Sequence, residues 1–468
     1  MYAPAAPVAP SVPWRQIVAA LLACTIIALA WTALPNPIIA LPLAVLPIAG
    51  LVCVRQPVFV VLLFASFSLF RLHEAVRVLY PLHIPQLLAL GAILTLVLHL
   101  KTERVRPYWT PALTVFAVFF GLVTLQTPLA LNRAYAMGMW SGNFSKIGIM
   151  VLAIAWLIRE PRQLGLAFRM FAVAGLVVAG VAISNKLNGI GLVEGTRVTI
   201  ARDLRSQLGD PNDLSLVLLF PASFALALIL GRGINVLDRA LGFVTFCAVF
   251  TGIIFTQSRG GLLGIMAVLG VFAWNRVRNK FLLLGAGAVV AMGLFVMAGV
   301  ADRQVVANSE GAIDESSQTR LYAWQAAFNM ACSRPLTGVG MDNFYANFFY
   351  YSPNWDGKNH AVHSTWFQIM AETGFIGFAV FITFIATTIG LGIRGFRRAR
   401  EGMRRSPTPS LTRLTASMEG LIAGVLGFCT SGTFLTQGFS WPLYISFALI
   451  VATERMISRE LDETLKTA

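Results

Sequence analysis

The chain of 468 residues is strongly apolar, with 57% hydrophobic and only 12% charged residues. Soluble domains carry roughly 25% charged residues, so this composition excludes an ordinary soluble protein. The net charge of +15 does not predict a nucleic-acid partner, because most of the excess lies in short loops on one side of the predicted membrane helices.

Fourteen apolar segments follow one another along the chain, most of them long enough to cross a hydrocarbon core of about 30 Å. Each segment is continuously apolar, and lipid requires a segment to satisfy its own backbone hydrogen bonds, so we predict helices rather than a β-barrel. The predicted fold is an all-α polytopic integral membrane protein with 12–14 transmembrane helices. The segments cover residues 16–34, 37–54, 57–70, 85–100, 111–130, 145–158, 163–183, 213–231, 237–256, 260–275, 280–299, 364–393, 414–432 and 441–453.

Short loops rich in lysine and arginine indicate how these helices are oriented. Strict alternation of the segments places all of these loops on one face, which is therefore predicted to be cytoplasmic, with both termini inside. The basic loops lie within residues 101–106, 159–162, 232–239, 276–280 and 394–405.

The predicted topology divides the chain into three parts. Residues 1–300 are expected to contain eleven transmembrane helices, and residues 364–468 three more with a cytoplasmic tail. Residues 301–363 are expected to form a small helical domain on the outer face. Its main helix is predicted to be amphipathic, capped by Ser316 or Ser317 and ended by Pro335. The expected apolar face of this helix contains Leu321, Trp324, Ala327 and Phe328.

Arginines on the outer face are unusual, because basic residues of membrane proteins tend to lie on the cytoplasmic side. Arg259 is the clearest example. It lies in a short turn between two apolar segments, where a charge is costly and tends to be functional. The alternative is an arginine that reaches toward lipid phosphate. Ser258, Gly260 and Gly261 favour a functional role, because small residues let a phosphate-bearing ligand approach the backbone.

A second arginine cluster occupies the outer loop before residue 213. Nearby aspartates could neutralise it, so anion binding and a solvated loop both stay open at this point. The cluster contains Arg197, Arg202 and Arg205. Arg320 lies on the predicted amphipathic helix. Arginine suits a pyrophosphate ligand, because its planar fork makes bidentate, charge-assisted hydrogen bonds and stays protonated.

His360 and His363 precede the apolar segment 364–393. Their spacing is compatible with zinc, but Asp356 and Glu372 are the nearby carboxylates and neither is a convincing third ligand, so we expect no metal. A neutral imidazole at the membrane boundary is a suitable general base near pH 7, which favours His363.

These residues resemble a known family. His363 and Ser364, then nine residues, then Gly374 and Gly377 are similar to the His-[Asn/Ser/Gln]-x9-Gly-x-x-Gly motif of bacterial O-antigen ligases, in the Wzy_C group of membrane glycan ligases and polymerases. The QSRGG turn resembles the family's outer-face turn with a functional arginine, here Arg259. The stretches TRLYAW and GTR resemble two further arginine positions of the family, Arg320 and Arg197.

The resemblance implies an inverting, metal-independent glycosyltransferase in the bacterial inner membrane, with its active site facing the periplasm and no cofactor. Such an enzyme moves a polysaccharide from undecaprenyl pyrophosphate to the lipid A–core oligosaccharide, among membrane lipids. His363 would be the general base, and Arg259 and Arg320 would neutralise the leaving pyrophosphate. Substrate-binding roles are expected for Arg197, Arg202, Arg205, Ser258, His360 and Ser364.

Gly374 and Gly377 are expected to have a structural role. On a continuous helix Gly374 would lie about 16 Å from His363, too far to touch the reacting atoms. Two glycines three residues apart would form a smooth face for helix packing.

Three other functions stay open on the sequence. An O-antigen or exopolysaccharide polymerase and a protein O-oligosaccharyltransferase of the same superfamily differ only in their acceptor. A lipid-linked glycan transporter would use the arginines for binding alone, and it predicts charges buried within the helices and paired repeats, neither of which is clear in this sequence.

Overall fold

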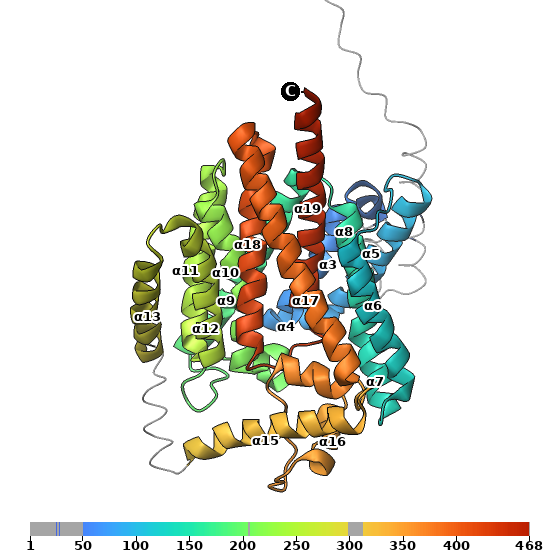
Figure 1. The fold of residues 1–468 in the computed structure, drawn as a ribbon, viewed down its shortest axis with the longest axis vertical. Helices are drawn as coiled ribbons and strands as arrows, with labels where there is room; N and C mark the ends of the chain where they lie inside the picture. Colours follow the sequence, from blue (N-terminus) through green and yellow to red (C-terminus); the bar gives the residue numbers. More distant parts are fainter. Residues whose placement is uncertain (1–24, 26–27, 29–49, 205, 298–311, 468) are drawn as a thin grey trace, which may run out of the picture.

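The computed structural model describes residues 25, 28, 50–204, 206–297 and 312–467. In these residues every regular element is a helix, apart from an isolated bridge between Val193 and Arg197. The predicted all-α fold is therefore confirmed. The chain forms a bundle of long, roughly aligned helices, with shorter helices at one end (Figure 1).

The α-helices follow one another along the chain with short connections between most of them. They are α3 (Pro57–Phe70), α4 (Leu72–Ala75), α5 (Ile84–Lys101), α6 (Pro111–Gln126), α7 (Arg133–Met139), α8 (Ser145–Leu157), α9 (Pro161–Leu187), α10 (Pro211–Leu230), α11 (Val236–Thr256), α12 (Arg259–Arg276), α13 (Lys280–Met297), α15 (Ala312–Ser333), α16 (Phe344–Tyr351), α17 (Thr365–Arg405), α18 (Pro409–Gly432) and α19 (Trp441–Thr467). Short 3₁₀ turns cover Arg77–Leu82, Thr127–Leu129, Arg202–Leu204 and Gln207–Gly209, and a π-helical turn covers Trp140–Phe144.

The apolar segments predicted from residue 57 onward each coincide with one of these helices. The described residues contain eight helices that are long and apolar enough to cross a membrane, and α3 and α13 are shorter apolar helices. The chain is thus a multi-pass membrane protein. The predicted segment 16–34, save for residues 25 and 28, and most of 37–54 lie outside the described residues.

Helix α10 forms the centre of the bundle, between α9, α11, α12 and α18. Nearly all of its side chains are buried, including Phe220 and Phe224. Pro221 lies inside this helix and packs against α9 at Gly175, where a Cβ atom would lie only 2.2 Å from the Pro221 Cβ. This close packing holds the middle of α10 against α9.

Helices α15 and α16 cross the end of the bundle opposite the C-terminus (Figure 1). They pack on the start of α17 and form a second apolar core with Ala323, Ala326, Ala327 and Met330 on the buried face of α15. The predicted apolar face was therefore partly wrong, because Leu321 and Phe328 are 58% and 49% exposed. Small alanines fill this face instead, since α15 lies close to α17.

The amphipathic helix α15 ends where the sequence predicts but begins earlier. The helix ends at Ser333, just before Pro335, as expected. Its start was misplaced, because it begins at Ala312, ahead of the predicted caps Ser316 and Ser317. The residues Ala312–Glu315 continue the helix without a proline or glycine to stop it.

Helix α17 is broken at Gly374, whose φ of 70° and ψ of −174° are not helical. The expected continuous helix with a smooth glycine face was wrong. A Cβ atom on Gly374 would lie 2.5 Å from the Pro335 carbonyl oxygen, which accepts a hydrogen bond from the Phe375 N–H (2.9 Å). At Gly377 a Cβ atom would lie 2.1 Å from Thr373 Oγ1, so this glycine accommodates the bend.

Candidate functional site

His363 lies in the connection between α16 and α17, at the end of the bundle covered by α15. Its φ of 47° is in the left-handed region, which is costly for a residue with a Cβ atom and is often found at functional sites. The His363 N–H donates to Thr436 Oγ1 (3.1 Å). Two residues on, Thr365 Oγ1 donates to the Leu435 carbonyl (2.8 Å) and accepts from the Gln437 N–H (3.3 Å). The connection between α18 and α19 therefore holds the histidine in place.

Burial and charges from two other segments act on the imidazole of His363. Burial is the main cause that lowers its pKa, and the positive charge of Arg320 on α15 lowers it further. Asp210, at the start of α10, acts in the opposite direction. The net result is a lowered pKa, so the imidazole is neutral near pH 7 and can accept a proton. The fold thus brings α10, α15 and α17 together around this side chain.

Arg259 is the first residue of α12, and its side chain is exposed. Gln257 turns the chain with a φ of 51°, and Ser258 then caps α12 by accepting a hydrogen bond from the Gly261 N–H (3.1 Å). Ser258 is 1% exposed, so its structural role as the cap is now clear. The capped turn thus sets the position of Arg259 at the start of α12.

The glycines after Arg259 allow close packing. A Cβ atom on Gly261 would lie 2.4 Å from Ser215 Oγ of α10, and one on Gly260 would lie 3.5 Å from the Phe434 Cβ. Gly261 therefore allows the Arg259 turn to pack directly against α10, and Gly260 lies beside the α18–α19 connection. The same connection binds His363, so the two predicted functional side chains are held by one structural unit.

Arg197 is 8% exposed and binds protein acceptors. Its Nε donates to the Thr256 carbonyl (3.1 Å), its Nη2 donates to Asn212 Oδ1 (2.8 Å), and its Nη1 lies 3.6 Å from a Glu194 oxygen. These contacts tie the loop before α10 to the last residue of α11, three residues before Arg259. The geometry favours positioning of the neighbouring turn over direct contact with a ligand.

The other predicted side chains occupy different environments. Arg202 is exposed on the turn Arg202–Leu204, and Arg205 lies outside the described residues. His360 Nε2 lies 2.8 Å from an Asp356 oxygen, and its ring packs edge-on against Phe348. Among the described residues, no group of three or more His, Cys, Asp or Glu side chains is arranged to hold a metal ion.

Ser364 differs from a usual helix cap. It precedes α17, but its hydroxyl makes no capping hydrogen bond. The Oγ atom is buried and lacks a protein partner in the described part of the chain. A buried hydroxyl without a partner costs free energy, so an acceptor or donor from a substrate would stabilise it. Ser364 follows His363 directly in the sequence, so this buried hydroxyl lies beside the backbone of the candidate base.

A cavity of about 540 Å³ lies beside this site, and sequence reasoning missed its residues. Thr436, which binds the His363 N–H, and Gln437 form part of its wall, together with the basic residues Arg71 and Lys146. Arg71 binds Glu74 Oε1 (2.7 Å). The signal in the sequence was weak, since these charges lie at the ends of apolar segments, where basic residues are common.

The comparison with protein families now bears on this geometry. The Wzy_C family, described as O-antigen ligase, matches residues 243–382. This stretch belongs to the Wzy_C family. The matched residues contain Arg259, Arg320, His363 and both motif glycines, Gly374 and Gly377. The expected relationship to Wzy_C proteins is confirmed, and it supports an enzyme that ligates or polymerises lipid-linked glycans in a membrane. None of the curated proteins matches the chain.

Proposed function

We propose that this Wzy_C protein transfers O-antigen polysaccharide from undecaprenyl pyrophosphate to the lipid A–core oligosaccharide. The observation that carries the proposal is His363 itself, a half-buried, neutral imidazole in a left-handed conformation with the Arg320 charge acting on it. In the proposed step, an acceptor hydroxyl oxygen attacks the anomeric carbon and gives its proton to His363. The bond from that carbon to the pyrophosphate oxygen breaks, and the pyrophosphate takes the electron pair.

Arg259 and Arg320 are proposed to stabilise the leaving pyrophosphate. Arg259 is exposed at the capped start of α12, and Arg320 is half-buried on α15 close enough to influence His363. Guanidinium groups that are already in place where charge develops stabilise the transition state without reorganisation. The proposed reaction is inverting and needs no metal, since pyrophosphate leaves without a proton and the glycosyl-phosphate bond supplies the energy.

The proposed location is the bacterial inner membrane, with this site on the periplasmic face. The basic run 394–405 ends α17 at the end of the bundle near the C-terminus, whereas α15 and α16 cover the opposite end (Figure 1). Basic residues favour the cytoplasmic side, which supports this orientation. The organisation into residues 1–300, 301–363 and 364–468 follows the same topology and stays a prediction.

Loss of either arginine should reduce transfer strongly. Arg259→Gln and Arg320→Gln are each expected to lower kcat/KM for the lipid-linked donor by about 100- to 1,000-fold, because each removes charge stabilisation from the leaving group. The measurement is transfer by the purified full chain with EDTA present. Arg133→Gln is the matched control, since Arg133 is also exposed and close to the same end, on α7. Equal losses in all three variants would contradict the proposed roles.

The acid limb of the pH–rate profile gives a separate test of the base. Because burial and Arg320 lower the pKa of His363, activity should fall only below about pH 6.5 as the imidazole is protonated. Arg320→Gln removes a charge that lowers this pKa and should move the limb to higher pH. Asp210→Asn removes a charge that raises it and should move the limb to lower pH. The profile of kcat/KM measures both shifts, and an unmoved limb in both variants would exclude His363 as the titrating group.

The acceptor separates ligase from polymerase. With the purified protein, lipid A–core oligosaccharide should accept the glycan, and a second lipid-linked glycan should not. In cells, deletion should leave unmodified core with long polymer on the lipid carrier. Core that carries a single O-unit would instead identify the protein as a polymerase, and transfer to a protein substrate would identify an oligosaccharyltransferase.

A further inference from the structure

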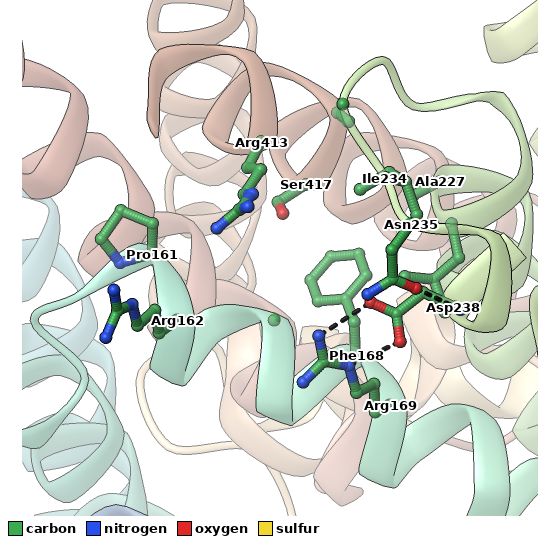
Figure 2. A pocket seen from close by; sticks show the side chains of 14 residues that line it. Pro161, Arg162, Phe168, Arg169, Ala227, Ile234, Asn235, Asp238, Arg413 and Ser417 are labelled. Carbon is green, nitrogen blue, oxygen red and sulfur yellow. Dashed lines mark hydrogen bonds and ion pairs between the residues drawn. The ribbon is translucent and has the colours of Figure 1, made fainter. Parts of the chain in front are cut away.

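A pocket of about 340 Å³ lies at the end of the bundle opposite His363. The starts of α9 and α18 and the turn between α10 and α11 form its walls, and three arginines line it (Figure 2). Arg413 and Ser417 of α18 lie across Phe168 from the ion pair between Arg169 and Asp238. None of these residues belongs to the candidate active site, so the pocket needs a separate explanation.

The charge of this pocket is not balanced by the protein. Arg169 donates to both Asp238 oxygens at 2.7 Å, so these two charges cancel. Within the described part of the chain, no side chain or backbone acceptor binds the guanidinium of Arg162 or of Arg413. Two positive charges therefore stay uncompensated at the pocket wall. The first turns of α9, α11 and α18 add the positive ends of three helix dipoles.

The remaining wall combines hydrogen-bond donors with an apolar surface. Asn235 uses its Oδ1 to accept from the Asp238 N–H (2.7 Å), which leaves its amide nitrogen to donate to a ligand. Ser417 lies one helical turn after Arg413 and adds a hydroxyl. Phe168 and Ile234 supply the apolar part. Such a wall fits an oxygen-bearing anionic group that is attached to an apolar carbon chain.

We propose that this pocket binds a phosphate group, held as the headgroup of an anionic phospholipid. Arginine forks match phosphate oxygens, and the apolar wall suits the glycerol and first acyl carbons. α9 and α18 both begin here and are long enough to span a membrane, which places the pocket where headgroups lie. The site is independent of glycan transfer and would tie the protein to anionic lipid at its basic end.

Native mass spectrometry of the purified full chain tests the site with phosphatidylglycerol, with phosphatidylcholine and with inorganic pyrophosphate. Phosphatidylglycerol should bind more tightly than phosphatidylcholine. Arg413→Gln and Arg162→Gln should each weaken phosphatidylglycerol binding by about tenfold or more, the usual effect of losing a charge-assisted hydrogen bond. Arg413→Lys keeps the charge and should weaken binding less. Arg404→Gln is the matched control, since it removes an exposed charge from the same end outside the pocket.

The outcomes are distinct. Loss of binding in the pocket variants but not in Arg404→Gln supports the site. Equal weakening by Arg404→Gln would show general attraction between basic protein and acidic lipid, and would overturn the proposal. If pyrophosphate saturated the pocket and phosphatidylglycerol did not bind, the pocket would be a site for free phosphate groups. That result would overturn the assignment to a lipid headgroup. Near-wild-type melting temperatures, measured for each variant, separate these results from misfolding.

Discussion

Replacing His363 with asparagine should lower glycan transfer by at least about a hundredfold while the protein stays folded. The variant removes the group proposed to take the acceptor proton. Asparagine is the suitable replacement because His363 has a φ of 47°, and asparagine tolerates the left-handed region better than alanine does. Single-turnover transfer and the melting temperature are measured together, since only activity should change.

His83 offers a matched control for this experiment. It also precedes a helix, α5, in a left-handed conformation with a φ of 49°, and it is exposed. His83→Asn makes the same chemical change in the same backbone geometry, and the His83 ring contacts the Pro81 carbonyl (2.9 Å from Nδ1) instead of the α18–α19 connection. It should retain wild-type transfer. Wild-type turnover by His363→Asn would rule out the proposed base, and equal loss in both variants would indicate a shared structural effect.

Gly374→Ala should destabilise the protein by roughly 2–5 kcal/mol and abolish transfer. Two costs combine here. Alanine is strained at a φ of 70°, and its Cβ atom would lie 2.5 Å from the Pro335 carbonyl oxygen, which is backbone and cannot swing away. The first part of α17 would have to move, together with His363 at its start. The free energy of unfolding and the transfer rate in a purified preparation measure the two effects.

Gly390 is the control within the same helix. A Cβ atom there would meet no atom within 4 Å, and the backbone is helical. Gly390→Ala should leave transfer unchanged and stabilise the protein slightly, because alanine favours a helix. If Gly374→Ala were as mild as Gly390→Ala, the break in α17 could not be essential for the geometry of the site.

Much of the fold could be predicted from the sequence, because membrane helices obey a strong local rule. Twenty or so apolar residues must form a helix to satisfy their own hydrogen bonds, so hydropathy located the long apolar helices from α3 onward, but not the short helices α4, α7 and α16. The candidate residues were also found locally, because an arginine in a short turn between apolar segments is unusual wherever it occurs.

The arrangement around His363 could not be predicted in the same way. Its N–H binds Thr436, 73 residues further along the chain, and the stretch around Thr436 has no chemical signature. The break at Gly374 depends on Pro335, which lies 39 residues before it. A pair of glycines alone does not say whether the helix continues or bends. Contacts between distant segments determine the position of His363 and the break at Gly374. A local sequence pattern does not predict such contacts.

The α18–α19 connection has a consequence for how small the working unit can be. A fragment ending at residue 432 would still contain Arg259, Arg320, His363 and both glycines, the complete set of motif residues. It would lack Thr436, the acceptor for the His363 backbone, and Gly438, whose N–H donates to Gln368 Oε1 (2.8 Å). Such a fragment would keep the reactive groups without the backbone that orients them. The motif and the minimal functional unit are therefore different lengths of chain, and a graft or a truncation has to respect the longer one.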